Sequence, residues 1–225
     1  GELFERTYND LETVLGAHRF SWVPLLGRQA DPHWVAAIWD CWIEKYCDDR
    51  TGWPWHAYTA AERAINIIDF AHRFGLPGNR DRTVRSLADH ADAIRKNLEY
   101  FGEHYTSNHL SNNGRGLLRI GVALGLEEYA EIGAKIMTAE AGRIFGRSGL
   151  LKEGSSHYHL LVTRNYIDAW LAADSVQMEQ ATFLREIAER AVAAISGLCL
   201  PGGMPLIGDV SPDAPPDHFS ILTGR

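Results

Sequence analysis

The chain lacks several features that would assign it to a common class of protein. Its 225 residues include only Cys41, Cys47 and Cys199, too few for a disulfide framework, and no paired Cys and His spacing suggests structural zinc. No apolar run approaches the roughly 18 residues that span a bilayer, and the N-terminal segment GELFERTYND is too polar for a secretory signal peptide. With 22 Lys and Arg against 29 Asp and Glu, the chain also lacks the basic excess of a nucleic-acid binder. Neither nucleic acid nor a membrane is therefore an expected partner.

What the chain does have is apolar sequence arranged with the period of amphipathic helices. Hydrophobic residues make up 45% of it, enough for a core in one large domain or two small ones. Asp31 and Pro32 are typical of a helix start, and Thr59 to Glu62 have the pattern of a capping box. Helices are expected over about residues 31–46, 59–75, 81–103, 109–124, 126–145, 158–173 and 178–200. Their short connections predict an all-α fold of antiparallel hairpins, either an open solenoid or a closed ring.

Two polar islands interrupt the helical pattern, each where a helix begins. The first, residues 105–114, reads Tyr-Thr-Ser-Asn-His-Leu-Ser-Asn-Asn-Gly. For Ser107 or Asn108, capping of the following helix is as good an interpretation as ligand binding. Asn112, Asn113 and Gly114 fall inside that helix, where all three are poor helix formers. Their presence indicates that something other than helix stability selected them.

The second island, residues 149–159, leads into another helix. It places Glu153, two serines, His157, Tyr158 and His159 within seven residues. The two histidines alternate rather than standing at i and i+4, the usual spacing of zinc ligands on a helix, and no third ligand stands nearby. We therefore expect no metal at this island, and nothing in the sequence indicates another cofactor.

Aromatic residues gather in the first quarter of the chain, where six of the seven tryptophans lie between residues 22 and 55. Trp34 and Trp42 have helical spacing and are expected in the core. Trp53 and Trp55 stand outside that period, in a loop before a helix. Such flat faces can stack on sugar rings, but packing over the helix ends is an equally good interpretation of either residue.

Charge is distributed unevenly along the chain. Residues 105–165 hold seven Lys and Arg against five Asp and Glu, a net charge of +2, whereas the segments on either side are acidic. An anionic ligand would be attracted to this segment because the local field, not the net charge, steers it. Ordinary solvated helix faces explain at least half of its basic side chains. These side chains include Arg115, Arg119, Arg143, Arg147, Lys152 and Arg164.

Four segments, in order, resemble motifs of the heparinase II/III-like polysaccharide lyases. Residues 53–58 with Arg63 are similar to an aromatic loop and its following arginine, and residues 107–114 to an Asn-His-Leu motif. Residues 153–159 resemble an E-x-S-x-x-Y-H segment, and residues 202–209 the segment that closes the helical domain. The match covers about residues 30–210, and Ser107 stands where many relatives have asparagine.

The resemblance implies an incomplete α/α toroid of antiparallel helical hairpins, with a substrate groove across one end. One such domain would occupy residues 1–225, without the C-terminal β-sandwich that family members usually carry. The implied activity is β-elimination at a uronic acid, with an acidic polysaccharide or oligosaccharide as partner. A periplasmic or extracellular location is implied only by the resemblance.

The resemblance also implies roles for single residues. Tyr158 would be the general acid and base, His109 its partner, and Asn108 the group that neutralises the uronate carboxylate. These roles suit the reaction, because a phenolate can take the C5 proton and an amide can stabilise the charge that builds on the carboxylate. The expected substrate contacts are Trp53, Trp55, His56, Tyr58, Arg63, Asn112, Asn113, Glu153 and His159.

Two other functions stay open at this point. A glycoside hydrolase on a related helical ring would need two carboxylates across a cleft. Glu153 could be one of them, but Glu62 has the position of a capping residue and Asp209 lies in the closing segment. A non-catalytic carbohydrate-binding or scaffold module would bind glycans without turnover.

Overall fold

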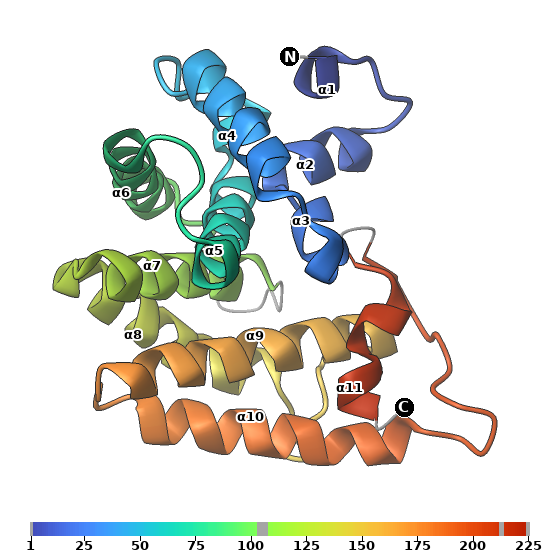
Figure 1. Ribbon diagram of the computed structural model, residues 1–225. Helices are drawn as coiled ribbons and strands as arrows, with labels where there is room; N and C mark the ends of the chain where they lie inside the picture. The colour runs from blue at the N-terminus through green and yellow to red at the C-terminus, as the bar shows by residue number, and fades with distance from the viewer. Residues whose placement is uncertain (1, 103–107, 212–213, 224–225) are drawn as a thin grey trace.

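The computed structural model describes residues 2–102, 108–211 and 214–223, and within them it consists of helices and loops (Figure 1). The longer helices are α2 (Leu11–Arg19), α4 (Pro32–Tyr46), α5 (Ala57–Phe74), α6 (Arg80–Lys96), α7 (His109–Leu124), α8 (Glu127–Ile144), α9 (Ser156–Ser175) and α10 (Ala181–Ile195). Short helices are α1 (Glu2–Glu5), α3 (Trp22–Leu25) and α11 (Ser220–Thr223). Among the described residues β pairing is limited to the isolated bridges Phe145–Leu151 and Leu200–Gly203.

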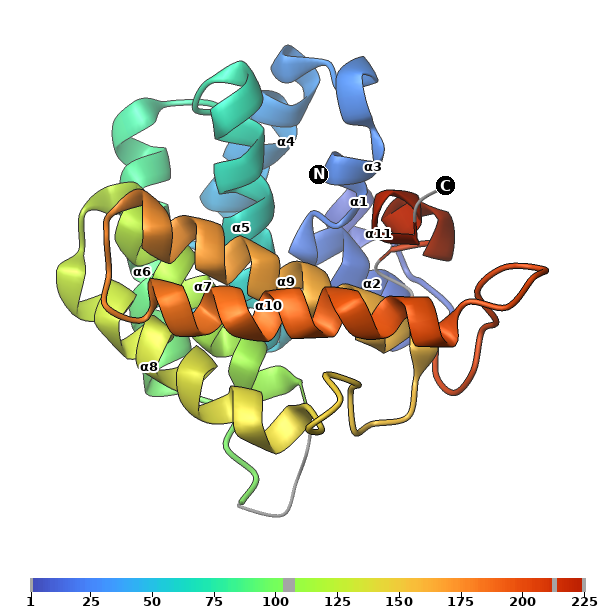
Figure 2. The same ribbon diagram turned by 90° about the horizontal axis from the view of Figure 1, so that it is seen from below.

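The helices form an incomplete α/α toroid, as the resemblance to the heparinase II/III-like lyases implies. The inner helices follow one another in space, because α2 packs on α5, α5 on α7, and α7 on α9. The outer helices α6, α8 and α10 cover them, and Figure 2 shows α10 lying along α9. One core cluster joins α2 and α4 to α7, the other joins α7 to α10, and α7 contributes side chains to both. The helix α7 is therefore the element that joins the two halves of the ring.

Glycines allow α7 and α8 to approach closely. A Cβ built on Gly133 would lie 2.3 Å from the backbone nitrogen of Leu118, and one on Gly121 would lie 2.4 Å from that of Ala130. Side chains larger than hydrogen at these two positions would push the helices apart. This close packing fixes α7, whose start carries the first polar island, against α8.

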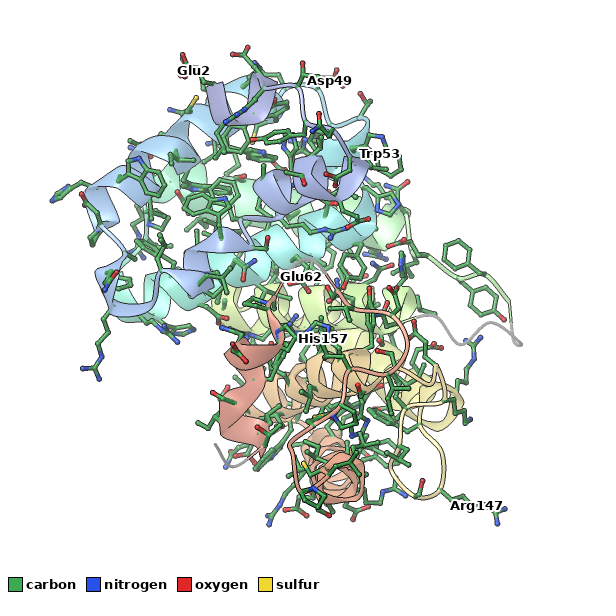
Figure 3. All side chains as sticks on the ribbon, turned by 90° about the vertical axis from the view of Figure 1, so that its right-hand side faces the viewer. Glu2, Asp49, Trp53, Glu62, Arg147 and His157 are labelled. Carbon is green, nitrogen blue, oxygen red and sulfur yellow. The ribbon has the colours of Figure 1, made fainter. Side chains whose placement is uncertain are left out.

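The inner helices α5, α7 and α9 all begin at one end of the ring, where Tyr58, His109 and Tyr158 of their first turns line a common cavity. Further along the same helices, Arg115 bonds to Glu62 of α5 at 3.0 Å and to Asp168 of α9 at 2.7 Å. Figure 3 shows Glu62 between the two halves of the molecule. This buried ion-pair cluster fixes the three helices relative to one another below the cavity.

Several local expectations are wrong. The helix α5 begins at Ala57, so the Thr59–Glu62 pattern is no capping box, and Glu62 pairs with Arg115 instead. The helix α6 ends at Lys96 rather than near residue 103. Trp34 is half exposed, whereas Trp42 is fully buried as expected. The buried face of α4 follows Val35, Trp39, Trp42 and Ile43.

Candidate functional site

A cavity of about 630 Å³ opens at the end of the ring where α5, α7 and α9 begin. It is lined by Leu11, Glu12, Leu15, Arg19, Trp53, His56, Tyr58, Glu99, Phe101, Asn108, His109, Tyr158, Asp209, Val210 and Ser211. Six of the residues expected from the sequence are among them. They come from three separate segments of the chain, so the fold brings together Trp53, His56, Tyr58, Asn108, His109 and Tyr158.

The aromatic loop supplies one wall of the cavity. Residues Trp53–Trp55 form a single 3₁₀ turn that leads directly into α5. Trp53 is 48% exposed and lines the cavity, whereas Trp55 is buried and donates its Nε1–H to the carbonyl of Tyr46 at 2.6 Å. The first turn of α5 then places His56 and Tyr58 on the same wall. Of the two tryptophans, Trp53 is placed to meet a ligand and Trp55 packs beneath the loop.

The start of α7 places two further polar groups at the cavity. Asn108 occupies the N-cap position, but its side chain makes no capping hydrogen bond within the described residues. It is largely buried and lines the cavity together with His109. The capping interpretation of Asn108 is therefore wrong. Ser107, the other residue for which capping was open, lies outside the described residues.

A carboxylate that the sequence did not indicate lies behind His109. Glu99 Oε1 lies 2.6 Å from His109 Nδ1 and 3.5 Å from His56 Nε2. Asn113 donates Nδ2–H to Glu99 Oε2 at 3.0 Å and accepts the backbone N–H of Glu99 at 2.9 Å. Burial acts to raise the pKa of Glu99, but the hydrogen bonds from His109 and Asn113 outweigh it, and the net shift is downward. Glu99 is thus held as a carboxylate.

The two asparagines inside α7 do not reach the cavity. Asn113 is fully buried, and its amide binds Glu99 instead of facing the cavity. Asn112 is also buried, and neither of its amide atoms has a hydrogen-bond partner among the described residues. Neither of these two poor helix formers lines the cavity. One of them, Asn113, binds a neighbouring carboxylate.

The second island is held in place by the segment that closes the ring. Ser155 caps α9 by accepting the backbone N–H of Tyr158 at 2.9 Å, and it donates its own hydroxyl to the carbonyl of Asp209 at 2.6 Å. The backbone N–H of Ser211 donates to His157 Nδ1 at 3.0 Å. These bonds bring residues 209–211 to the cavity beside Tyr158. The closing segment is therefore part of the site.

Three expected substrate contacts lie away from the cavity lining. His159 is buried, with Nδ1 accepting from the backbone of Leu151 at 3.3 Å and Nε2 3.1 Å from the carbonyl of Ala191. Arg63 is fully buried, with its guanidinium 3.8 Å from the centre of the Trp42 ring. Glu153 is exposed, and partial burial and then the charge of Asp209 raise its pKa, while His109 lowers it. Charged groups that line the cavity therefore shift the pKa of Glu153, although its own side chain does not line the cavity.

Arg63 instead supports a helix that does line the cavity. Its Nη1 donates to the carbonyl of His18 at 2.9 Å, and Asn66 of the same helix donates to the carbonyl of Arg19 at 2.9 Å. These two bonds satisfy carbonyls at the C-terminal end of α2. They fix the helix that carries Arg19, whose guanidinium lies 4.9 Å from the centre of the Tyr58 ring and pairs with Glu12 at 3.1 Å.

The basic residues of the positive middle segment do not line the cavity. Arg115 and Arg119 pair with buried or half-buried carboxylates of α5 and α9, and Arg143 pairs with Glu140 at 2.6 Å. Lys152 donates to two carbonyls near the end of α8. The side chains of Arg115 and Arg119 are thus used to hold the inner helices together, and the expectation that the charge of this segment attracts an anionic ligand stays a prediction.

The N-terminal ends of three helices give the cavity a positive potential. The helices α5, α7 and α9 have 18, 16 and 20 residues, and all three point their N-terminal ends at it. Each N-terminus carries the equivalent of roughly half a positive charge. Arg19, His56 and His109 add cationic or ionisable groups, against the carboxylates of Glu12, Glu99 and Asp209. The arrangement favours a carboxylate placed at the helix starts.

Among the residues that the structure describes, no three His, Cys, Asp or Glu side chains converge as metal ligands. Nor is any described helix both long and apolar enough to cross a bilayer.

Glu99, Phe101, Arg19 and Asp209 are among the cavity residues that the sequence did not indicate. The helical period runs on past residue 96 and places Glu99 and Phe101 on a helix, whereas the structure places both in a loop. Arg19 comes from α2, a helix that the sequence pattern did not predict. Asp209 stands in a predicted motif but was assigned no contact with a ligand.

Comparison with known proteins supports the fold. No protein-family model and no curated protein matches the sequence. The crystal structure of heparan sulfate lyase HepC from Pedobacter heparinus is similar, with a TM-score of 0.63 and 17% identity over 91% of this chain and 35% of the other. A crystal structure of heparinase III gives a TM-score of 0.65 and 18% identity over 87% of this chain and 32% of the other. The chain thus spans about a third of the length of these proteins, and it has the helical toroid fold of heparinase-type lyases.

Proposed function

We propose that this chain carries the helical part of a polysaccharide lyase site, which cleaves an acidic polysaccharide at a uronic acid by β-elimination. The observation that carries the proposal is the meeting of Asn108, His109 and Tyr158 at one cavity, from the first turns of two inner helices. The fold it shares with HepC and heparinase III, whose names denote lyases, supports the same reaction class.

The chemistry requires a base near C5 of the uronate and an acid near the leaving oxygen O4. In the proposed reaction Tyr158, as phenolate, takes the C5 proton, the C4–O4 bond breaks, and a C4=C5 double bond forms. The phenol then returns a proton to the leaving oxygen. Asn108 and the positive ends of α7 and α9 stabilise the negative charge that builds on the carboxylate. His109 assists the ionisation of Tyr158.

The substrate contacts form the outer part of the proposed site. Trp53 and Phe101 are both about half exposed at the cavity, and their flat faces suit the apolar faces of sugar rings. The same two residues would serve a module that binds glycan without cleaving it, which is the second candidate function. The hydrolase alternative loses ground because Glu99, the most buried carboxylate of the cavity, is engaged by His109 and Asn113.

A substitution of Tyr158 tests the proposal. With heparan-, chondroitin- and alginate-type substrates, the native chain is expected to generate the ultraviolet absorbance of an unsaturated uronate. Tyr158→Phe should lower that rate at least about 10²-fold, because it removes the group that moves the proton. Tyr129→Phe, a matched change on α8 outside the cavity, should leave the rate unchanged.

Three outcomes would contradict the lyase proposal. Cleavage by Tyr158→Phe at the native rate would remove Tyr158 from the chemistry. New reducing ends without an unsaturated product would indicate hydrolysis instead. Glycan binding that survives Tyr158→Phe and His109→Ala, with no turnover by the native chain on any substrate, would favour the binding module.

A further inference from the structure

Glu99, in the loop between α6 and α7, makes more hydrogen bonds than packing alone requires. Glu99 is only 8% exposed at its side chain, and both of its oxygens are engaged. Its position is fixed twice by Asn113, which holds both the side chain and the backbone N–H of the same residue. Asn113 stands one helical turn after His109 on α7, so the two residues share a face of that helix. The helix α7 therefore carries both the imidazole of His109 and the amide of Asn113 that positions Glu99 against it.

We propose that Glu99 is a positioning residue that fixes the tautomer and orientation of His109 at the site. Its Oε1, 2.6 Å from Nδ1, accepts the Nδ1–H of the imidazole. The proton of a neutral His109 is thereby assigned to Nδ1, and Nε2 becomes the nitrogen with a lone pair. A ring held in this way presents Nε2 as a proton acceptor. The inference rests on the proposed lyase function for its effect on turnover, but not for its effect on the imidazole.

Asn113 makes this arrangement specific for a carboxylate. A carboxylate accepts at both oxygens, and here one oxygen accepts from Asn113 Nδ2 and the other from His109. A glutamine at position 99 has one oxygen and one NH₂ group. Either its NH₂ faces the NH₂ of Asn113, or it faces Nδ1 of His109 and demands the opposite tautomer. Glu99→Gln therefore disturbs one of the two contacts in either orientation.

The same carboxylate also faces a second imidazole. His56 Nε2 lies 3.5 Å from Glu99 Oε1, so the oxygen that binds His109 is also the nearest anionic atom to His56. Glu99 therefore lies within reach of imidazoles from the starts of both α5 and α7.

A spectroscopic experiment tests the inference without any need for activity. In long-range ¹H–¹⁵N correlation spectra recorded where the ring is neutral, native His109 should show the Nδ1–H tautomer. Glu99→Ala, which removes the acceptor of Nδ1–H, should convert it, at least in part, to the Nε2–H form that histidine favours in water. The signals of His109 are identified by their loss in His109→Asn. Glu131→Ala, which removes an exposed carboxylate of α8, is the matched control and should leave the tautomer unchanged.

Turnover gives the second readout. If the native chain is a lyase, Glu99→Ala should lower kcat about 10²- to 10⁴-fold with little change in KM, as expected when a base loses the group that orients it. Glu99→Asp keeps the charge but shortens the reach by one methylene, so it should retain more activity and more of the Nδ1–H form. Should Glu99→Ala fail to fold, Glu99→Asp and Asn113→Ala provide the same comparison.

The outcomes separate the two proposals. A change of tautomer in Glu99→Ala together with an inactive native chain would support the positioning of His109 and contradict the lyase function. An unchanged tautomer in a folded Glu99→Ala variant would overturn the inference, whatever the activity. An active native chain with full kcat in Glu99→Ala would overturn it as well.

Discussion

Single residues at the cavity divide into those a ligand can reach and those that hold them. Trp53 and Trp55 illustrate the division, because they are two positions apart and only Trp53 lines the cavity. Trp55 donates its indole N–H to a carbonyl and packs beneath the loop. His109 and Asn113 show the same division on α7, where the imidazole faces the cavity and the amide holds Glu99. Each reachable group thus has a buried neighbour that fixes it.

Trp53 should contribute to carbohydrate binding. We expect Trp53→Ala to weaken the binding of acidic oligosaccharides several-fold to tenfold, because a stacked aromatic face contributes about 0.5–1.5 kcal/mol. Trp34→Ala is a close control, since Trp34 is 50% exposed and Trp53 48%, and Trp34 lies on α4 outside the cavity. Titration calorimetry measures both dissociation constants. Equal weakening by the two variants would show that Trp53 has no particular contact with the ligand.

Asn108 should affect turnover and not stability. It stands at the N-cap of α7 without a capping hydrogen bond, so Asn108→Ala should lower the free energy of unfolding by less than about 1 kcal/mol, the usual cost of losing an N-cap. The same variant should slow elimination about 10²- to 10³-fold, the usual effect of losing one donor to a developing negative charge. Urea denaturation and absorbance assays give the two numbers. A loss of stability of about 1 kcal/mol or more with normal turnover would restore the capping interpretation.

At the scale of elements, the α7–α8 hairpin governs where the site lies. We expect Gly133→Ala to destabilise the protein by about 1–3 kcal/mol, because its Cβ would meet the α7 backbone at 2.3 Å. Gly142→Ala on the same helix meets nothing within 4 Å and should be stabilising by up to about 1 kcal/mol. Thermal denaturation compares the two. If Gly133→Ala were as stable as Gly142→Ala, the helices would not be in the close contact described.

The elements themselves were largely readable from the sequence. The helix α7 was predicted over residues 109–124, which are its observed bounds, because its apolar residues follow the helical period. The helix α6 was predicted too long, because apolar spacing continues through Leu98 and Phe101 although the backbone of Glu99 bonds to Asn113. Local spacing carries no information about such a contact between a loop and a distant helix. The sequence therefore did not place Glu99 in the predicted site. For the same reason it did not predict the pairing of Glu62 with Arg115.

At the scale of the whole molecule, buried histidines should make stability depend on pH. Burial, and then the charges of Arg63 and Lys45, lower the pKa of His18 to about 4. In the unfolded chain histidine titrates near pH 6.5, so the unfolded state binds the extra proton between these values. The contribution of His18 is complete above about pH 6.5 and is lost as the pH falls toward 4, a change on the order of 3 kcal/mol.

Urea denaturation at a series of pH values measures this dependence. His18→Gln should show a shallower fall in the free energy of unfolding between pH 6.5 and 4 than the native chain. An identical slope in the two proteins would mean that His18 takes up its proton without unfolding, and that its burial has no role in acid sensitivity.

The convergence of the starts of α5, α7 and α9 on one cavity has a consequence for the selectivity of the proposed lyase. An attraction that arises from the peptide groups of a helix start has no proton to lose and no single side chain whose replacement abolishes it. Under the proposed function, side chains at the cavity could vary to suit different sugars while the preference for an anion persists. The choice of charge would then be a property of the backbone, and the choice of sugar a property of the loops that surround it.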